Sequence, residues 1–406
     1  MFGDLWWLLI LSLLVLSLVT RQGALILLTV LLALGAVLSW LSYRFGLYGV
    51  QYTRSLRDRR IFCDQETELA IEVTNAKPLP LAWLLVRDRF PRGLGLVVQD
   101  RIHGEDLETF PPELRELIVL RGHESARRTY RVRGYHRGVY TFGTATMASG
   151  ALFGLQQKRE TLEHLDYLTV YPKIVPVESL ELPFERPAGT GRAQRRITED
   201  PLRQAGVREY VPGDSVRHIH WKNTAHLGTL QTKLFDPQAS EVVMLALDVQ
   251  TTYDPYQAVP EYLELLISAT ASLAVDMLEQ RQSTGLLVNS GPGDTEHWTH
   301  IAPSRHPEQG ARLLEALAPL TGFRTLALSH LLYRSMHVLP YGSTVVVLTA
   351  RTVEPVLLAL LTLQRAGHPV VLLTVGDRQP WIPERFTTHH LGGRDAWHQL
   401  EGLALA

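Results

Sequence analysis

Two long uncharged runs at the N-terminus constrain this chain most. Residues 5–20 and 24–43 contain no Asp, Glu, Lys or Arg, and only three residues, 21–23, separate them. A bilayer core about 30 Å thick needs roughly 20 apolar residues in a helix, so the second run is long enough to cross it and the first is slightly short. Trp and Tyr lie near the ends, where amphipathic rings favour the headgroup zone. The pattern predicts a transmembrane helical hairpin over residues 1–43.

Two other interpretations of these runs are weaker. A cleaved signal peptide begins with basic residues, whereas this chain has Asp4 before the first run and a second apolar run directly after it. A buried helical hairpin of a soluble protein keeps a polar face, and neither run has one. We therefore expect the hairpin to anchor the chain in a membrane and to contact its lipid.

Positive charge after the second run predicts the orientation. Residues 44–60 contain five arginines and a single acid, Asp58, and are predicted to form a basic juxtamembrane segment. Basic clusters near the ends of spans stay on the cytoplasmic side. We expect a two-span anchor in the inner (cytoplasmic) membrane, with both termini and the bulk of the chain in the cytoplasm. The one cysteine, Cys63, agrees with a reducing compartment and excludes an internal disulfide.

Composition narrows the classes of function. Forty Lys and Arg balance forty-one Asp and Glu, so the formal net charge is −1. A dedicated nucleic-acid binder usually carries a basic excess, and no nucleic-acid partner is expected. The apolar fraction of 46% is enough for folded cores, and 406 residues suggest a multidomain chain at about 150 residues per domain.

Residues 61–180 are predicted to form a β-sandwich-like domain. Residues 68–75 alternate polar and apolar side chains, as in a half-buried strand. Further strand candidates are residues 82–88, 117–120, 127–133, 138–142 and 167–171. Glycine and proline separate them at short intervals without a helical period, which is typical of an antiparallel sandwich. Residues 181–206, which contain several Pro and Gly, are predicted to be a linker.

The most distinctive stretch is residues 207–240. Residues 207–225 have the sequence VREYVPGDSVRHIHWKNTA, in which residues 212–214 predict a tight turn. Cationic residues surround Trp221, which is large enough to anchor the stretch to the next domain. His218 and His220 are two residues apart and would share one face of a strand. Because no third ligand is nearby, a polar packing role is favoured for them over a metal site.

From residue 241 onwards, apolar strands alternate with helices. The expected strands are residues 242–248, 285–289, 345–349 and 370–375. The expected helices are residues 261–281, 306–320 and 355–366. Apolar strands separated by helices predict a Rossmann-like α/β domain over residues 241–406, with a parallel sheet covered on both faces.

These features together resemble the bacterial family called domain of unknown function 58. The run Arg208–Ala225 matches its motif Arg-Glu-Tyr-x-Pro-Gly-Asp-Ser-x-Arg-x-Ile-His-Trp-Lys-x-x-Ala, and residues 137–143, 153–155 and 170–172 match shorter elements. One departure is residues 149–152, Ser-Gly-Ala-Leu, where the family often has an acid before Phe-Gly. The resemblance implies a von Willebrand factor A-like domain over residues 241–406. It also implies MoxR-type AAA+ ATPases and other membrane-complex proteins as partners, in assembly or maturation of protein complexes.

The resemblance also raises the question of a metal site. Complete members have Asp-x-Ser-x-Ser at a strand end, where the oxygens hold Mg²⁺. This chain has Asp-Val-Gln-Thr-Thr at residues 248–252, so Asp248 and Thr252 keep suitable oxygens while Gln250 adds bulk. Arg351, after a later strand, places a competing cation nearby. We expect a metal-free scaffold without a cofactor, with Mg²⁺ at Asp248 and Thr252 as the less favoured alternative.

The sequence contains no phosphate-binding loop, nucleophile elbow or zinc-protease motif. We therefore expect a non-enzymatic, membrane-anchored adaptor with no catalytic residues. The candidate partner-binding residues are Arg208, Tyr210, Asp214, Arg217, His220, Trp221 and Lys222. The alternative is a membrane-bound hydrolase around Asp214, His218 and His220, which combine an acid with imidazoles. A third interpretation, a cell-wall binding module, needs the soluble part to lie outside.

Overall fold

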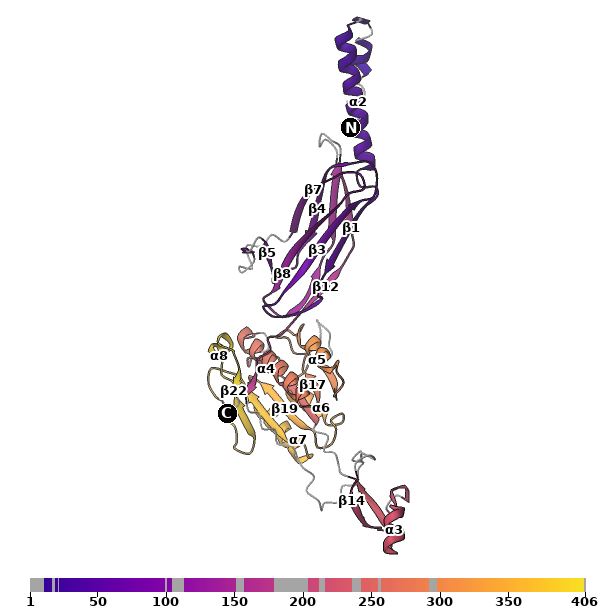
Figure 1. The fold of residues 1–406 in the computed structure, drawn as a ribbon. Coiled ribbons are helices and arrows are strands. Elements are labelled where there is room, and N and C mark those ends of the chain that lie inside the picture. Colours follow the sequence, from indigo (N-terminus) through magenta and orange to yellow (C-terminus); the bar gives the residue numbers. More distant parts are fainter. Residues whose placement is uncertain are drawn as a thin grey trace. The chain divides into compact units, whose positions relative to one another are not determined.

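The computed structural model describes most of the chain and divides it between Lys173 and Ile174 into two compact units (Figure 1). The described residues are 11–16, 19–20, 22–98, 101–103, 113–150, 157–178, 204–211, 216–235, 242–254, 257–291 and 298–404. The first unit contains an apolar helix and a β-sandwich, and the second contains an α/β domain.

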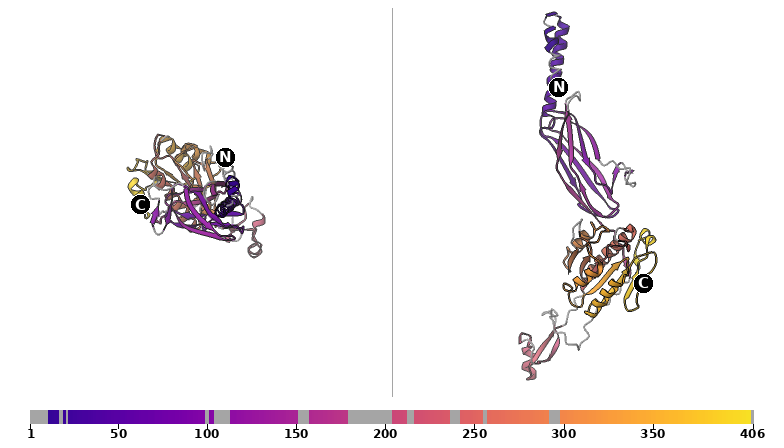
Figure 2. Two further views of the ribbon diagram at one scale, coloured as in Figure 1. Left: turned by 90° about the horizontal axis from the view of Figure 1, so that it is seen from above. Right: turned by 180° about the vertical axis from the view of Figure 1, so that it is seen from behind.

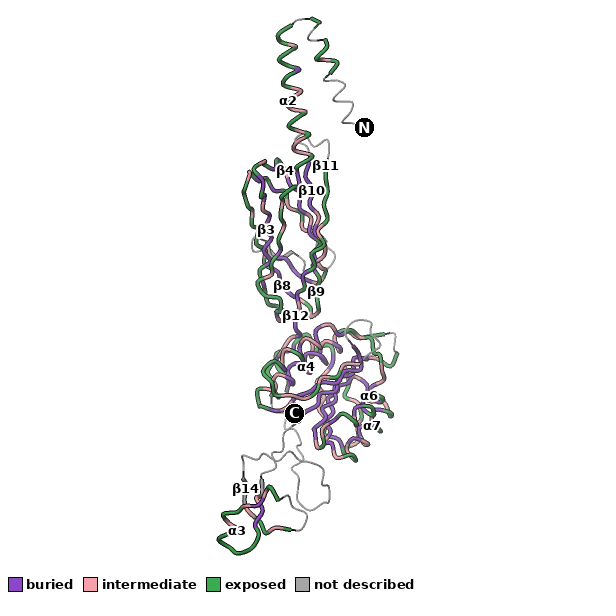
Figure 3. The backbone as a smooth tube through the Cα atoms, turned by 90° about the vertical axis from the view of Figure 1, so that its right-hand side faces the viewer, coloured by how far each residue is buried: buried purple, intermediate pink, exposed green. Residues whose placement is uncertain are grey.

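One long apolar helix opens the first unit. Helix α2 (Gly23–Phe45) has 23 residues and is about 34 Å long at 1.5 Å per residue, and it is apolar enough to cross a membrane. Its side chains are mostly exposed or half-buried (Figure 3), as in a helix surrounded by lipid. Residues 11–16 and 19–20 are helical too, but the rest of the first apolar run lies outside the described residues. One candidate span is therefore shown, and the two-span hairpin stays a prediction.

The rest of the first unit is a sandwich of short strands, seen from behind in Figure 2. In chain order they are β1 (Val50–Leu56), β2 (Arg60–Phe62), β3 (Glu66–Asn75), β4 (Leu81–Arg89), β5 (Leu94–Val98), β6 (Arg101–His103), β7 (Glu113–Leu120), β8 (Ser125–Gly134), β9 (Gly138–Phe142), β10 (Ala145–Gly150), β11 (Gln157–Leu162) and β12 (Asp166–Tyr171). The sheets have the orders β1-β3-β8-β5-β6, β11-β10-β4-β7 and β2-β12-β9. Neighbouring strands are antiparallel except β2 and β12. The six strands expected from the sequence correspond to β3, β4, β7, β8, β9 and β12.

Two apolar clusters explain how the three sheets stack. In the first, Ile71 and Val73 of β3 pack against side chains of β4, β7 and β10. In the second, Leu69 of β3 and Val132 of β8 pack against side chains of β9 and β12. The five-stranded sheet therefore packs against both smaller sheets, and each of these covers a different part of its length.

Strand β1 corrects the predicted boundary at residue 61. It pairs with β3 from Val50 to Leu56, so residues 44–60 are not a separate juxtamembrane segment. Of the five arginines there, Arg44 ends α2 and Arg54 is buried in the sandwich. The sequence of residues 44–60 indicated a basic segment because arginines dominate its charge. In the structure, burial alternates along β1, which places Val50–Leu56 in the sheet. This correction concerns only the domain boundary. The cytoplasmic orientation that these arginines predicted stays a prediction.

Arg54 is the buried centre of the sandwich. Its Nη1 donates to Asp88 Oδ1 at 2.7 Å, and its Nε donates to Asp166 Oδ2 at 2.9 Å. Its remaining N–H groups donate to the carbonyl oxygens of Phe142, Gly143 and His164. All five donors of the guanidinium are used, so the cost of burying this charge is offset by two carboxylates and three carbonyls. The network joins β1, β4, β9 and β12.

Cys63 provides a first testable property of the sandwich. Burial, reinforced by the neighbouring Asp64 carboxylate, raises the pKa of its thiol from 9.0 to about 11. Because the thiolate is the reactive form, we expect iodoacetamide to alkylate Cys63 about a hundredfold more slowly in the folded chain than in denaturant at mildly alkaline pH. Equal alkylation rates, followed by mass spectrometry, would contradict this environment.

The second unit contains a mostly parallel sheet with helices between its strands. Its elements are β13 (Val177–Glu178), β14 (Gln204–Glu209), η1 (Val216–His218), α3 (Trp221–Leu227), β15 (Gln231–Phe235), β16 (Val242–Leu247), α4 (Pro260–Glu279), β17 (Ser283–Val288), β18 (Thr299–Ser304), α5 (Gln309–Leu317), α6 (Leu328–Ser335), β19 (Thr344–Thr349), α7 (Glu354–Arg365), β20 (Val370–Thr374), β21 (Thr387–His390), α8 (Arg394–His398) and β22 (Leu403–Ala404). The main sheet has the order β18-β17-β16-β19-β20-β21, in which only β17 and β18 are antiparallel.

Residue burial explains this arrangement. Every residue of β19 and β20 is buried, as in a parallel sheet covered on both faces. The four strands and three helices expected after residue 241 correspond to β16, β17, β19, β20, α4, α5 and α7, so the alternating pattern predicted this α/β arrangement correctly. Most of the predicted linker, residues 181–206, lies outside the described residues, and β14 already begins at Gln204.

Candidate functional site

The distinctive stretch folds as a small β-hairpin with a helix between its strands. Strands β14 and β15 are antiparallel, with Arg208 opposite Thr232. Thr232 also forms a bridge with Ile219, so β15 lies between β14 and the segment that leads into α3. Helix α3 ends at Gly228, whose φ of 72° is left-handed and whose N–H donates to the Thr224 carbonyl. We call residues 204–211 and 216–235 the hairpin module.

The structure distributes the predicted partner-binding residues over three short elements of this module. Arg208 lies in β14, Tyr210 directly follows it, and Arg217 lies in η1. Trp221 and Lys222 begin α3, and both are exposed. Asp214 and the predicted tight turn at residues 212–214 lie outside the described residues.

The two histidines of the module do not share a strand face. His218 ends the 3₁₀ turn η1, whereas His220 precedes α3, and its Nδ1 accepts a hydrogen bond from the Asn223 N–H at 3.0 Å. His220 therefore caps a helix, which the spacing alone could not indicate. The structure gives no support to the hydrolase alternative from these rings, and the Asp214 part of that alternative stays untested.

The hairpin module exposes an unusual amount of apolar surface. Trp221 is 65% exposed, so within the described chain it does not anchor the module to the next domain as its size suggested. The other large apolar side chains exposed here are Val211, Val216, Leu227 and Leu230. A stretch of this length that exposes five such side chains, next to several cations, is typical of a protein-binding surface.

A second cluster lies where the order of the main sheet changes direction. After β16 the chain adds β17 on one side and β19 on the other, so the carboxyl ends of these strands meet at a switch point. Asp248, directly after β16, is fully buried there. Its Oδ1 accepts hydrogen bonds from Asn289 Nδ2 at 2.7 Å and from the Gln250 N–H at 3.1 Å. Its Oδ2 accepts from Thr349 Oγ1 at 2.9 Å and from Arg351 Nη2 at 3.4 Å.

These contacts do not fit a Mg²⁺ site. Both Asp248 oxygens are used by protein donors, and the buried Arg351 guanidinium supplies the positive charge. The Thr252 hydroxyl donates to the Asp254 and Gln257 carbonyls at 2.7 and 2.6 Å instead of facing a cation. Mg²⁺ would need near-octahedral oxygens at about 2.0–2.1 Å in place of these donors. The described residues also contain no group of three His, Cys, Asp or Glu that could hold a metal.

The Asp248 cluster and all but the first two residues of the hairpin module fall inside one family match. Residues 206–385 match the family described as protein of unknown function DUF58. The match confirms the family resemblance for this DUF58 segment, which contains the run Arg208–Ala225. The match assigns no function to this chain, because the function of the family is itself unknown.

The similar proteins that comparison identifies are distant in sequence. The chain is 25% identical over 242 residues to uncharacterized protein YeaD of Bacillus subtilis (strain 168), a match that covers 60% of this chain and 56% of that protein. Among solved structures, the CARDB domain of the PF1109 protein from Pyrococcus furiosus has 10% identity and a TM-score of 0.19, over 30% of this chain and 91% of that domain. Trypsin-activated alpha-2-macroglobulin from Escherichia coli has 18% identity and a TM-score of 0.21, over 32% of this chain and 9% of that chain. Likeness at these TM-scores carries no information on function.

Sequence reasoning found Asp248 and its competing Arg351 but missed Asn289. The fold implied by the family resemblance predicted that residues after β16 and β19 would meet, and the 3.4 Å contact bears this out for Asp248 and Arg351. Asn289 directly follows β17, so the same argument, applied to that strand, points to it as a third member. Its Oδ1 also accepts from the Val249 N–H at 2.9 Å, which locks the loop.

Proposed function

We propose that this chain is a non-enzymatic, membrane-anchored adaptor that binds a partner protein through its hairpin module. The observation that carries the proposal is the exposed apolar set around Trp221. Trp is enriched among the energetic anchors of protein interfaces, and the cations Arg217 and Lys222, close to Trp221 in the sequence, favour a partner surface with acidic groups at its rim.

The family resemblance supports the nature of the partner. The run Arg208–Ala225 resembles the domain of unknown function 58 motif, which implies a MoxR-type AAA+ ATPase and a role in assembly or maturation of membrane-linked protein complexes. The switch-point Asp248 on a mostly parallel sheet supports a von Willebrand factor A-like domain. The Asp248–Arg351 pair supports a metal-free form of that domain.

The anchor and its orientation belong to the same proposal. Helix α2 supplies one span, and the apolar run before it supplies a second, so that both termini and the DUF58 segment face the cytoplasm. A fluorescent reporter that matures only in the cytoplasm, fused to the C-terminus, is expected to be bright. A dark reporter, together with activity of a periplasmic alkaline phosphatase fusion, would support the cell-wall binding interpretation instead.

Affinity purification tests the partner. The tagged full-length protein is solubilised in detergent from its own cells, with ATP or with EDTA, and the co-purified proteins are identified by mass spectrometry. Recovery of an AAA+ ATPase is the expected result. Failure to recover any protein reproducibly under both conditions would contradict the adaptor role and would favour the hydrolase alternative.

Trp221→Ala is expected to reduce recovery of the partner at least about thirtyfold, the factor that corresponds to about 2 kcal/mol for an interface anchor. Trp381→Ala is the matched control, since Trp381 is 84% exposed elsewhere in the second unit. Because both side chains are largely exposed, neither change should alter amide exchange in β16 or β19. Equal recovery with both variants would show that the hairpin module is not the contact.

A further inference from the structure

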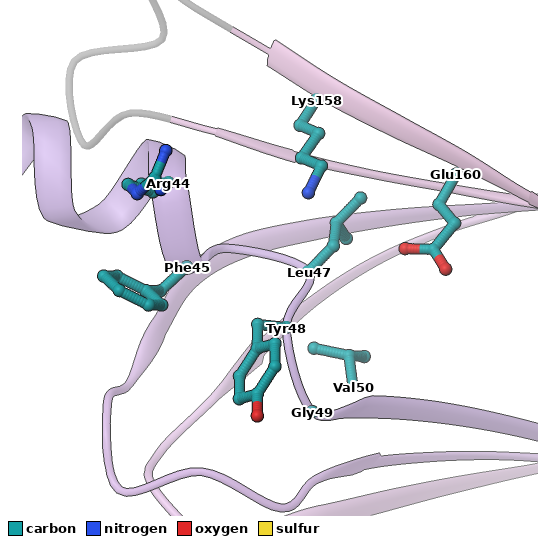
Figure 4. A pocket seen from close by; sticks show the side chains of 8 residues that line it. All are labelled: Arg44, Phe45, Leu47, Tyr48, Gly49, Val50, Lys158 and Glu160. Atoms are coloured by element: carbon teal, nitrogen blue, oxygen red, sulfur yellow. The ribbon is translucent and has the colours of Figure 1, made fainter.

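A polar cavity of about 500 Å³ lies where α2 joins the sandwich (Figure 4). Arg44 comes from the last turn of α2, and Lys158 and Glu160 come from β11. Phe45 and Tyr48 contribute aromatic rings from the chain that leaves the helix. None of these residues belongs to the DUF58 segment, and neither the adaptor role nor the sandwich core uses the cavity.

The end of α2 is fixed to the sandwich, so the fold sets the shape of the cavity. The buried Lys77 ammonium donates to the carbonyl oxygens of Gly46 at 2.5 Å and Tyr48 at 3.0 Å. Burial lowers the pKa of Lys77, but these two carbonyls lie at a helix C-terminus, where a cation is favoured. A lysine of the sandwich therefore caps the helix and holds the wall of the cavity in place.

The cavity carries unpaired charge. Arg44, Lys158 and Glu160 are exposed, and in the part of the chain that the structure describes none of them forms an ion pair. Lys158 and Glu160 are two residues apart on β11 and share a face, whereas Arg159 between them points to the other face. Two cations and one anion give the cavity a net charge of +1.

With α2 spanning the membrane as proposed above, the cavity lies at the depth of lipid headgroups. An α2 of about 34 Å slightly exceeds the hydrocarbon core of about 30 Å, so its last residues reach the membrane surface. Phe45 and Tyr48 pack edge to face with their ring centroids 6.4 Å apart, and Tyr48 is 71% exposed. Exposed aromatic rings at this position are typical of the interfacial belt of membrane proteins.

We infer that this cavity binds the phosphodiester of an anionic phospholipid headgroup, with Arg44 and Lys158 donating to the phosphate oxygens. The net charge of +1 matches the single negative charge of a phosphodiester, whereas a free phosphate carries up to two. The net positive charge favours the anionic phosphatidylglycerol over a zwitterionic choline lipid, and Glu160 can accept a hydrogen bond from the glycerol headgroup hydroxyl. The lipid then contacts both the span and the sandwich.

Native mass spectrometry of the full-length protein in detergent tests this site by titration with phosphatidylglycerol and, separately, phosphatidylcholine. Lys158→Gln and Arg44→Gln are each expected to weaken phosphatidylglycerol binding about fivefold, the factor that corresponds to about 1 kcal/mol per basic residue. Arg159→Gln is the matched control, because it removes the same charge from the neighbouring residue on the opposite face of β11.

Arg159→Gln is expected to leave phosphatidylglycerol binding unchanged, and sodium phosphate should not displace the lipid beyond the effect of sodium chloride at the same ionic strength. Equal loss with Lys158→Gln and Arg159→Gln would overturn the site, because it would show attraction by general surface charge only. Displacement by phosphate itself would overturn the assignment to a lipid. Equal binding of phosphatidylcholine would overturn the selectivity for anionic headgroups.

Discussion

Replacement of Arg54 by methionine is expected to destabilise the sandwich by about 3–5 kcal/mol, the range found when one partner of a buried ion pair is removed. Methionine keeps much of the side-chain length but leaves Asp88 without a cation, and Asp166 with only the exposed guanidinium of Arg59 at 3.9 Å. The side chains of Asp88 and Asp166 are only 5% and 8% exposed, so water cannot solvate them well. The carbonyls of Phe142 and His164 would also lose their donors.

Hydrogen–deuterium exchange of the full-length protein measures this loss locally, as faster exchange of β1, β4, β9 and β12 amides. Arg57→Met is the matched control, since Arg57 is 70% exposed and lies 3.8 Å from Glu68, a surface pair worth at most about 1 kcal/mol. Arg54→Lys keeps the charge without the planar fork and should fall between the two. A loss for Arg54→Met no greater than for Arg57→Met would show that the network does not hold the sheets together.

Arg54 also illustrates which strands of the sandwich could be predicted. Strand β3 alternates polar and apolar residues over most of its length, so its sequence was sufficient. Strand β10 contains mostly small residues that are nearly all buried between β4 and β11, whereas strand β11 is polar except for Leu162 and almost entirely exposed at an edge. Neither has period two in hydrophobicity, and β1 was missed because the arginines on both sides of it made residues 44–60 look like a separate basic segment. These strands are set by their neighbours rather than by their own pattern.

The candidate site divides in the same way. Asp248 and Arg351 could be placed together because the family resemblance implies a fold in which the carboxyl ends of parallel strands meet at one edge. The state of Trp221 could not be predicted, since a large aromatic residue suits a core and an interface equally well. The helix cap at His220 depends on a turn of three residues before α3, which two-residue spacing between histidines does not reveal.

Replacement of Arg351 by methionine is expected to destabilise the α/β domain by about 3 kcal/mol, because it leaves the fully buried Asp248 carboxylate with neutral donors only. The contact between Arg351 Nε and the Gln250 carbonyl at 3.3 Å would be lost as well, which frees the loop after β16. Faster amide exchange of β16 and β19 in the full-length protein is the expected observation. Arg378→Met, at an exposed arginine of the same unit, controls for the loss of charge.

The same variant tests whether Arg351 takes the place of a metal ion at the switch point. The double variant Asp248→Asn with Arg351→Met removes the unpaired charge and should recover at least about 1 kcal/mol of the loss, as coupled neighbours do. Mg²⁺ and EDTA should leave amide exchange of β16 equal in the natural chain, since four donors already saturate the carboxylate. Protection of the natural chain by Mg²⁺ would show that a cation displaces the guanidinium. Protection of Arg351→Met alone would show that the arginine is what excludes the cation from Asp248.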